Sequence, residues 1–237
     1  MSLVPLALIG MGKMGRALAA LAPEKGFRVV AELDPSHAGY AGVTRESLAD
    51  AQVAIEFTTP DAAPENARAC ARAGCPVVVG TTGWYAQLDA VSNDVEQAGG
   101  SILTAPNFSI GVAIFDRIVG EAARIYAGLP RFADAHLVET HHNAKLDAPS
   151  GTAGMLARTA GKGLGREVPI TSVRVGSVPG THELIFDSAF EQVRLVHEAR
   201  DRRVFAEGAL LAARWLVGRR GRFTLQDVLA DAIPASQ

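Results

Sequence analysis

Two adjacent histidines and a nearby lysine, His141, His142 and Lys145, are the residues whose types and spacing could do chemistry. They lie in the sequence Glu-Thr-His-His-Asn-Ala-Lys-Leu-Asp-Ala-Pro-Ser-Gly-Thr, residues 139–152, directly after an alternating segment that is typical of a β-strand. Histidine exchanges a proton near neutral pH, and the lysine adds a positive charge close to it. This stretch therefore favours proton transfer to a negatively charged molecule.

A helix N-terminus follows these residues. Ser150, Gly151 and Thr152 lead into a helical pattern over residues 153–160, and Ser150 or Thr152 is a candidate N-cap. The free N–H groups and the positive dipole end of such a terminus suit an anion, most simply a carboxylate. Taken singly, a strand histidine is more often packed and a Ser-Gly-Thr turn is more often only a cap, so the prediction depends on further evidence.

That evidence lies near the N-terminus, where an apolar run over residues 3–9 is followed by Gly10-Met11-Gly12-Lys13-Met14-Gly15 and a helix over residues 16–22. Strand, G-x-G-x-x-G and helix in this order form the dinucleotide-binding fingerprint. Gly10 permits the tight turn, Gly12 lets the backbone approach a pyrophosphate, and Gly15 lets helix and strand pack closely.

The next strand, residues 27–33, ends at Asp34, roughly 20 residues past the glycines, where an acid would bond the ribose hydroxyls of adenosine. Asp34 could instead be only a turn residue before Pro35. Strands and helices continue to alternate up to residue 107, which predicts a parallel, doubly wound sheet. Ligands bind outside the carboxyl ends of the strands in such a sheet, and the loops expected there are 10–15, 58–60, 80–83 and 105–108.

The pattern changes after Asn107. A long helix over residues 109–129, the strand before His141 and three alternating segments, 170–175, 181–186 and 192–198, predict a second domain with a mostly antiparallel sheet. Residues 203–217 read as a closing helix. The basic run 214–222 is expected to be the end of that helix and the loop after it.

The composition is that of an ordinary globular protein, with 48% hydrophobic and 20% charged residues. A formal charge of −2 argues against a dedicated nucleic-acid-binding protein. Cys70 and Cys75 form neither a CxxC pair nor a disulfide framework, so reduced, buried thiols are expected. The chain shows no apolar run long enough to span a bilayer and begins without a basic leader, which predicts a cytoplasmic protein.

With these motifs in hand, the whole chain resembles the 4-hydroxy-tetrahydrodipicolinate reductase family, also called dihydrodipicolinate reductases. The most specific shared string is His-His-x-x-Lys-x-Asp-Ala-Pro-Ser-Gly-Thr at 141–152, supported by segments at 12–15, 57–60, 79–83, 105–109, 174–176, 180–182, 197–202 and 205–210. The resemblance implies an α/β fold, with an N-terminal Rossmann-type doubly wound parallel sheet and a second α+β domain built on an open mixed sheet. The implied domains are 1–106, with 205–237 packing back on it, for the dinucleotide, and 107–204 for substrate binding and oligomerisation, usually as a homotetramer.

The resemblance also implies roles for individual residues. His141 resembles the proton donor and acceptor, and Lys145 the catalytic proton donor. His142 and the Gly151-Thr152 pair resemble the substrate-carboxylate contacts, with Lys145 and the helix start at Ser150 also expected to bind the substrate. The cofactor contacts would be Gly10, Met11, Gly12, Lys13, Met14, Gly15, Asp34, Gly80, Thr81, Thr82, Ala105, Pro106, Asn107 and Phe108. The implied reaction is hydride transfer from NADH or NADPH to a small cyclic dicarboxylate, with loss of its hydroxyl as water.

Two departures from the family pattern bear on the cofactor. The glycine loop is one residue shorter than the usual G-x-x-G-x-x-G form, and Asp34 is followed by Pro35, where many members have an arginine. An acid without that arginine repels the extra phosphate of NADPH and favours NADH. Lys13 could still attract a phosphate.

Three other functions would use some of the same residues. Another Rossmann oxidoreductase of amino-acid metabolism, or a nucleotide sensor that has lost catalysis, would keep the cofactor loops, but the 141–152 string argues against both. A metal hydrolase using His136, His141 and His142 is disfavoured by their spacing and by the lack of an evident carboxylate, so no metal is expected. Arg174, His182 and His197 are expected to pack on a strand surface or at an interface, and the sequence assigns them no role.

Overall fold

The structure is a computed structural model that describes residues 2–36, 40–129 and 134–232. The chain forms two compact units, one made of Met1–Ser109 with Arg203–Gln237 and the other of Ile110–Arg202. The chain therefore enters the first unit twice, and its C-terminal segment completes that unit.

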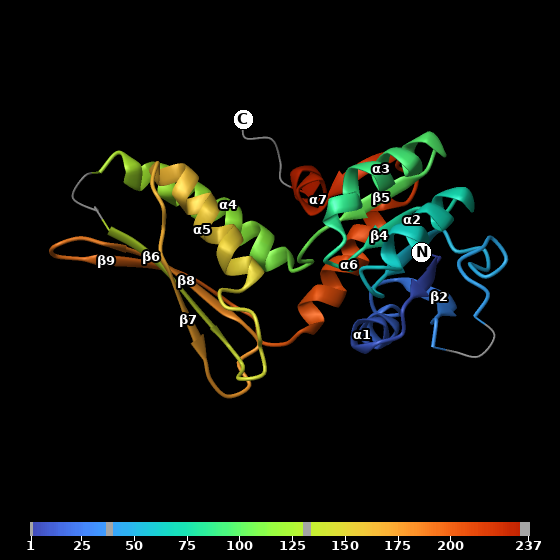
Figure 1. Cartoon of the computed structure of the whole chain (residues 1–237), viewed down its shortest axis with the longest axis horizontal. Helices are drawn as coiled ribbons and strands as arrows, with labels where there is room; N and C mark the ends of the chain where they lie inside the picture. The colour runs from blue at the N-terminus through green and yellow to red at the C-terminus, as the bar shows by residue number, and fades with distance from the viewer. Residues whose placement is uncertain (1, 37–39, 130–133, 233–237) are drawn as a thin grey trace. The chain divides into compact units, whose positions relative to one another are not determined.

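The first unit contains a six-stranded sheet in which every neighbouring pair is parallel. The strand order is β10-β5-β4-β3-β1-β2, so β1 lies between β2 and β3, which is one of the two common orders of doubly wound parallel sheets. The strands are β1 Val4–Ile9, β2 Phe27–Leu33, β3 Val53–Glu56, β4 Val77–Val79, β5 Ser101–Thr104 and β10 Gly221–Thr224. The helices are α1 Lys13–Leu21, α2 Ala63–Arg72, the 3-10 helix η1 Tyr85–Gln87, α3 Leu88–Gln97, α6 Arg203–Leu216 and α7 Leu225–Ala232 (Figure 1).

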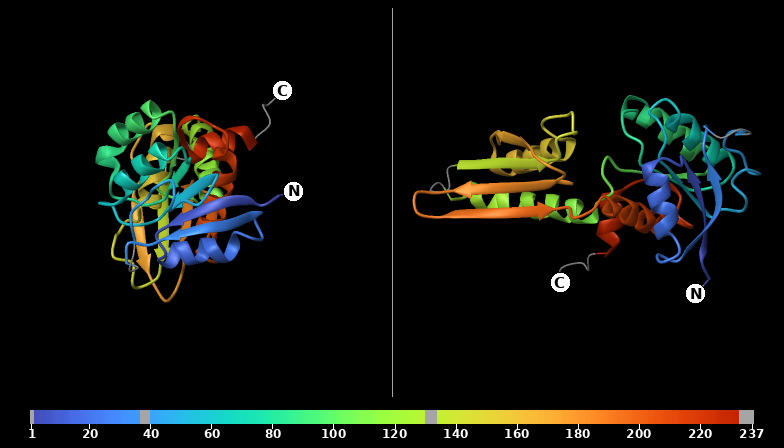
Figure 2. Two further views of the ribbon diagram at one scale, coloured as in Figure 1. Left: turned by 90° about the vertical axis from the view of Figure 1, so that its right-hand side faces the viewer. Right: turned by 90° about the horizontal axis from the view of Figure 1, so that it is seen from below.

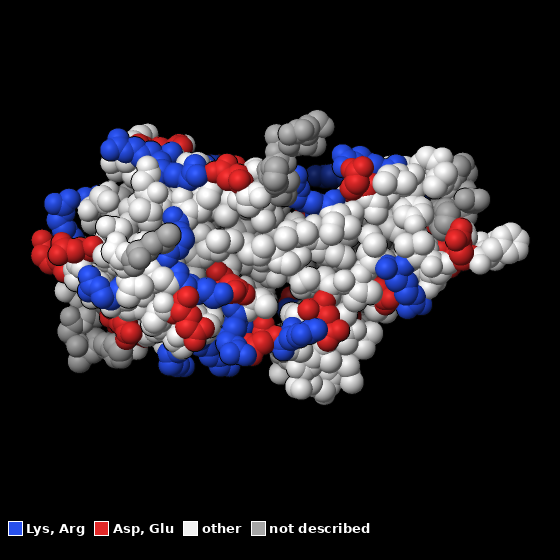
Figure 3. Space-filling view, turned by 180° about the vertical axis from the view of Figure 1, so that it is seen from behind, with Lys and Arg blue, Asp and Glu red and all other residues white. Residues whose placement is uncertain are grey.

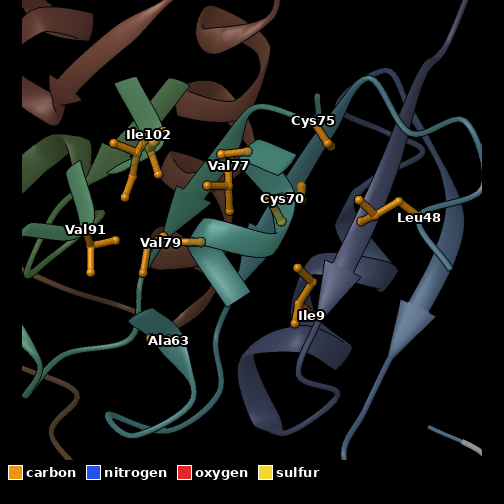
Figure 4. Packing of buried hydrophobic residues seen from close by; sticks show 14 of the residues in the cluster. Ile9, Leu48, Ala63, Cys70, Cys75, Val77, Val79, Val91 and Ile102 are labelled. Carbon is orange, nitrogen blue, oxygen red and sulfur yellow. The ribbon is translucent and has the colours of Figure 1, made fainter. Parts of the chain in front are cut away.

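Alternate residues of these buried strands pack on helices. Ile9, Val79 and Ile102 point from the sheet toward α2 and α3, where Cys70 and Val91 complete the core (Figure 4). Helix α6 packs against β3, β4 and β5 and against α1. Both cysteines are free and buried, as predicted, and burial raises the pKa of the Cys75 thiol to about 12.

One expectation about the C-terminal segment is wrong. The residues after Arg220 are not loop, because Gly221–Thr224 forms strand β10, which runs parallel to β5 and is followed by α7. Arg222 and Thr224 are exposed on this edge strand, and Arg222 pairs with Asp89 at 2.6 Å. A four-residue edge strand with a charged exposed side carries no apolar run, so periodicity could not reveal it.

The second unit is a four-stranded mixed sheet covered by two helices. Its order is β7-β6-β8-β9, with β7 parallel to β6 and the other two pairs antiparallel, which confirms the predicted fold class. The elements are α4 Ile110–Ala127, β6 Asp134–His141, α5 Gly151–Leu164, β7 Ile170–Arg174, β8 Thr181–Asp187 and β9 Gln192–Glu198. Helices α4 and α5 lie side by side along one face of the sheet (Figure 1 and Figure 2).

Leu137, Leu184 and Phe186 point toward α4 and α5 and are fully buried. The alternate residues of the four strands point to the other face of the sheet, where Val173 of β7 and Val196 of β9 are exposed. Across the parts of the chain that the structure describes, no helix combines the length and the apolar character that crossing a membrane requires.

Candidate active site

The pairing of strands brings His141 together with three other polar side chains at one end of the second unit's sheet. His141, the last residue of β6, pairs with Arg174 at the end of β7, and Glu139 pairs with His182 near the start of β8. Glu139, His141 and His182 are buried and share the face that α4 and α5 cover, since residues two apart on a strand point the same way. Side chains from three strands, β6, β7 and β8, thus meet at this end of the sheet.

The centre of this group is an ion pair between His141 Nδ1 and Glu139 Oε2. Arg174 Nη2 donates to the other carboxylate oxygen of Glu139 at 2.7 Å. Burial raises the pKa of Glu139, but hydrogen bonds from Arg174, Ser172 and His141 outweigh it and lower that pKa to about 2. The carboxylate is therefore ionised and can only accept, so His141 carries its hydrogen on Nδ1.

His141 Nε2 is consequently the nitrogen that gains or loses a proton. Burial lowers the pKa of His141, Glu139 opposes this, and Lys145 and Arg174 lower it further. Gly180 lies against Nε2, because a Cβ there would be 3.0 Å from this atom, and its φ of +152° suits glycine. The glycine leaves that side of the imidazole uncrowded.

His182 packs edge-on against His141, with ring centroids 5.3 Å apart. Burial, followed by the neighbouring histidines His141 and His197, lowers the pKa of His182 to about 4, so its imidazole is neutral near pH 7. A neutral ring allows His141 to become cationic without a second positive charge beside it.

The loop after β6 brings Lys145 and His142 to the same end of the sheet. Lys145 Nζ is 2.7 Å from Asp147 Oδ1, and Arg174 Nη2 donates to the backbone carbonyl of Asp147 at 2.6 Å. His142 Nε2 accepts from Arg202 Nη2 at 2.6 Å. The predicted lysine and second histidine thus each have a charged neighbour, and Arg202 adds a positive charge that the sequence analysis did not assign.

Helix α5 begins where the sequence predicted, with Ser150 as its N-cap. The Ala153 backbone N–H donates to Ser150 Oγ at 3.1 Å, and this oxygen also lies 3.3 Å from His182 Nε2. A Cβ built on Gly151 would meet nothing within 4 Å. The space beside Gly151 at the helix start is therefore open to a ligand, whereas the Ser150 hydroxyl is already engaged in the cap.

The predicted substrate-domain residues all lie in the segment 141–152. In the structure, side chains of this segment contact further residues that were not predicted to belong to the site, namely Glu139, His182 and Arg202, with Arg174 bound to Glu139. Glu139 could have been found, since a residue two before His141 on a strand must share its face. Arg174, Arg202 and His182 gave no such local signal. Their proximity depends on the pairing of strands that lie more than 30 residues apart.

The metal-hydrolase reading needs a correction. Glu139, His141 and His182 each offer a ligand atom, and these atoms lie within 4.8 Å of one another, so a carboxylate does stand near the histidine. His136 is not part of this set, because it lies on the opposite face of the sheet and bonds Thr171 Oγ1 at 2.7 Å. The Arg174 guanidinium already occupies Glu139, which makes the cluster unfavourable for a divalent cation.

In the first unit, the predicted cofactor loops begin at one level of the sheet. Register aligns the strand ends Leu33, Ile9, Glu56, Val79 and Thr104 in a row. The residues that follow them start the loops at Asp34, Gly10, Phe57, Gly80 and Ala105. This carboxyl edge is where open α/β sheets bind ligands.

The three glycines of the first loop differ in what surrounds them. Gly10 has a φ of +95°, and a Cβ there would lie 2.1 Å from the Phe57 carbonyl oxygen. A Cβ on Gly15 would lie 2.0 Å from the Gly10 carbonyl oxygen, whereas one on Gly12 would meet nothing within 4 Å. Gly10 and Gly15 are therefore required by the fold, while the space beside Gly12 can receive a nucleotide.

Other predicted cofactor residues shape the same edge. Asp34 Oδ2 accepts from the Met11 N–H at 3.1 Å, and its Oδ1 accepts from the Ser36 N–H at 2.9 Å. Asp34 therefore has a turn role and also contacts the glycine loop. Lys13 and Met14 open helix α1. Thr81 and Phe108 are buried, while Thr82 and Pro106 are exposed.

Comparison with known proteins decides the family. The protein-family model described as dihydrodipicolinate reductase, N-terminus, matches residues 4–108 of the sequence. The family model described as dihydrodipicolinate reductase, C-terminus, matches residues 111–229. The chain belongs to the dihydrodipicolinate reductase family. This confirms the resemblance inferred from the sequence and makes the chain a pyridine-nucleotide-dependent oxidoreductase.

Curated family members match over nearly their full length. The 4-hydroxy-tetrahydrodipicolinate reductase of Gluconobacter oxydans is 37% identical over 254 residues, covering 97% of this chain and 99% of the relative. The enzyme of the same name from Christiangramia forsetii is 33% identical over 240 residues, with 95% and 98% covered. A dipicolinate-bound dihydrodipicolinate reductase from Paenisporosarcina sp. TG-14 superposes with a TM-score of 0.78 at 23% identity, covering 94% of this chain and 97% of that structure. This last match supports the fold.

Proposed function

We propose that the protein reduces 4-hydroxy-tetrahydrodipicolinate to tetrahydrodipicolinate with a nicotinamide cofactor, in the diaminopimelate route to lysine. The observation that carries the proposal is the Glu139–His141 pair, which lies at the same end of the sheet as Lys145 and the open start of α5. Such a set can bind an anionic ring and transfer protons to it. Family membership supplies the substrate class.

In this proposal the two substrate carboxylates are bound by positive charge and by backbone donors. The N–H groups of Gly151 and Thr152, at the positive end of the helix dipole, would bind one carboxylate, with Lys145 and His142 supplying further contacts. Ser150 would act through the cap and not by direct contact. Arg202, which donates to His142, adds to the positive field of this group.

The bound nicotinamide supplies the hydride, and the chain supplies the protons. Lys145 would protonate the leaving hydroxyl or the electron-rich ring, since a lysine ammonium group is a proton donor. His141 would exchange a proton through Nε2, because Nδ1 is held by Glu139. Glu139 would thereby stabilise the protonated imidazole.

The substrate-site proposal is tested by Gly151→Ala and by dipicolinate, the planar dicarboxylate bound in the related structure. Alanine is favoured over glycine within helices by up to about 1 kcal/mol, so the variant should be at least as stable as the wild type. Its added methyl group would fill the open space in front of the helix N–H groups. We expect dipicolinate affinity, measured by calorimetry, to fall about tenfold or more, equivalent to about 1.4 kcal/mol.

Gly154→Ala is the matched control, because Gly154 lies one turn further along the same helix and its Cβ would meet only the flexible Arg158 side chain. Dipicolinate should bind this variant as it binds the wild type. Equal affinities for the wild type and the Gly151→Ala variant would show that the helix start does not bind the carboxylate.

The cofactor proposal is tested by Gly12→Val. A side chain at this position meets open space in the protein, so we expect the thermal unfolding temperature to change little. The same side chain would lie where the backbone must approach the pyrophosphate, so the affinity for NADH should fall by about two orders of magnitude. Fluorescence titration of NADH measures it. Unchanged affinity in a folded variant would place the cofactor elsewhere.

We propose NADH as the preferred cofactor because Asp34 ends β2 beside the glycine loop and no arginine follows it. Asp34→Ala should raise KM for NADH more than KM for NADPH, since it removes a partner for a free ribose hydroxyl and a charge that repels a 2′-phosphate. The loss of the Met11 contact affects both cofactors, so the ratio of the two KM values is the informative quantity. An unchanged ratio would leave Asp34 only its turn role.

We also propose a cytoplasmic homotetramer. Val173 and Val196, with exposed fractions of 37% and 53%, lie on the sheet face opposite α4 and α5, which suits burial against another copy. Light scattering after gel filtration measures the mass.

On the face shown in Figure 3, positive and negative side chains are interspersed, which favours a small substrate over a nucleic acid.

A further inference from the structure

Glu56 is a buried acid to which none of the proposed cofactor or substrate contacts assigns a role. It is the last residue of β3, it has no solvent exposure, and it sits in the row of strand ends between Ile9 and Val79. A buried carboxylate normally has a cation beside it. Among the residues that the structure describes, the hydrogen-bond partners of Glu56 are instead neutral.

These partners belong to one cofactor loop and one helix, and one of them also contacts a second loop. Glu56 Oε1 accepts from the Thr58 N–H at 3.0 Å, from the Thr58 hydroxyl, and more weakly from Asn66 Nδ2 in α2 at 3.5 Å. The Thr58 N–H also donates to Thr81 Oγ1 at 2.8 Å. Through Thr58, one carboxyl group therefore ties the loop after β3 to the Gly80–Gly83 loop after β4.

The Glu56–Thr58 segment also touches the remaining loops. The Gly80 N–H donates to the Glu56 carbonyl at 2.9 Å, and the Phe57 carbonyl lies against Gly10. The Phe57 ring packs edge-on against Phe108, with centroids 6.1 Å apart. A shift of this segment would therefore move all four loops of the proposed cofactor site.

The surroundings of Glu56 favour its neutral form. Burial raises the pKa of Glu56, against the opposing effect of its hydrogen bonds, of which that from the Thr58 hydroxyl is the strongest. The titratable groups that face it are Tyr40 and Cys70, and burial raises the pKa of both. Both are uncharged near pH 7, so among the residues described around Glu56 no positive charge offsets an ionised carboxylate. Glu56 Oε2 is buried and has no hydrogen-bond partner in the described chain, which fits a protonated acid better than a charge.

We propose that Glu56 is a positioning residue that, as a neutral acid, holds the loops after β3 and β4 in the shape that binds the nicotinamide cofactor. The inference rests on the proposed cofactor loops. It assigns their geometry to a residue that does not touch the cofactor. Because the acid is neutral, glutamine should replace it, since the amide keeps an acceptor oxygen and a donor at matching positions.

The test compares Glu56→Gln, Glu56→Ala and the wild type by NADH titration and steady-state kinetics. We expect Glu56→Gln to bind NADH within about twofold of the wild type. Glu56→Ala leaves the Thr58 hydroxyl without its acceptor, whereas Asn66 keeps its other contact, from Nδ2 to Thr58 Oγ1 at 3.3 Å. The dissociation constant and KM for NADH should rise about tenfold or more, with kcat at saturating NADH changed less than about threefold.

If Glu56→Ala does not fold, Thr58→Val replaces it, because valine removes the hydroxyl donor and keeps the shape; the same rise in KM is expected. A second readout is stability against pH. A raised pKa in the folded state makes the wild type lose stability relative to Glu56→Gln as pH rises from the ordinary glutamate pKa through the folded one. An ionised Glu56 with a lowered pKa would give the opposite trend.

Gly12→Val separates this inference from the cofactor proposal. If Gly12→Val lowers the affinity for NADH and Glu56→Ala does not, the inference about Glu56 is wrong and the proposed cofactor site stands. If neither variant lowers the affinity for NADH, the cofactor loops themselves are wrongly assigned. If Glu56→Gln loses affinity as strongly as Glu56→Ala, the charge of Glu56 matters and its proposed neutral role is overturned.

Discussion

Replacing Lys145 by alanine should lower kcat about 100- to 1,000-fold, the range expected when a positioned proton donor is removed. The lysine ammonium is tied to Asp147 at 2.7 Å in the loop that connects β6 to α5. It therefore lies at the same end of the sheet as His141, whereas Lys162, the other described lysine of this unit, lies in the last turn of α5. The affinity for NADH should stay within about twofold, since the proposed cofactor loops belong to the other unit.

Lys162→Ala is the matched control for this experiment. Lys162 is an exposed lysine in the last turn of α5, so its loss removes the same charge from the same unit without touching the site. Steady-state kinetics and NADH titration on both variants separate the two effects. Near-normal turnover in Lys145→Ala would remove this lysine from the mechanism.

The second large effect concerns the ion pair beneath His141. Glu139→Gln removes the carboxylate that stabilises the protonated imidazole, so we expect kcat to fall about 100-fold. The pKa of His141 is already lowered by burial, with Glu139 opposing that shift. Without Glu139 it falls further. If protonated His141 is the active form, the loss of activity at high pH should begin at a lower pH than in the wild type.

Arg174→Ala should move that same limb of the pH profile in the opposite direction. The Arg174 charge lowers the pKa of His141, so its removal should raise this pKa and extend activity to higher pH. Glu183→Gln is the control, because Glu183 lies on the other face of the sheet, in an ion pair with Arg194 at 2.9 Å. Shifts of the same sign in the Glu139 and Arg174 variants would contradict an electrostatic role for the pair.

Local patterns in the sequence were sufficient for most of the fold. The glycine loop, the buried apolar strands and the change to alternating strands after Asn107 each reflect contacts within a few residues. Strand β10 was missed because its place beside β5 depends on a pairing between residues 101–104 and 221–224. A four-residue edge strand has too few apolar residues for its sequence pattern to predict such a pairing.

Some features of the candidate site likewise follow from local sequence, whereas others depend on residues that are far apart in the chain. The helix start at Ser150 and the acceptor role of Asp34 in its turn follow from local chemistry, and both appear in the structure. The ionised state of Glu139 depends on Arg174, 35 residues away, and only the register of β6 and β7 brings them together. Gly12 and Gly151 also required coordinates, because only these show that a side chain there meets open space.

Synthase-dependent oxidation of NADH and NADPH tests the central claim most directly. The substrate would be generated in place from pyruvate and aspartate semialdehyde by the preceding synthase, and oxidation followed at the nicotinamide absorbance. We expect oxidation only when the synthase is present, and faster with NADH than with NADPH. No oxidation with either cofactor, by a folded protein that still binds both, would contradict the proposed reaction and favour another acid as substrate or a sensing role.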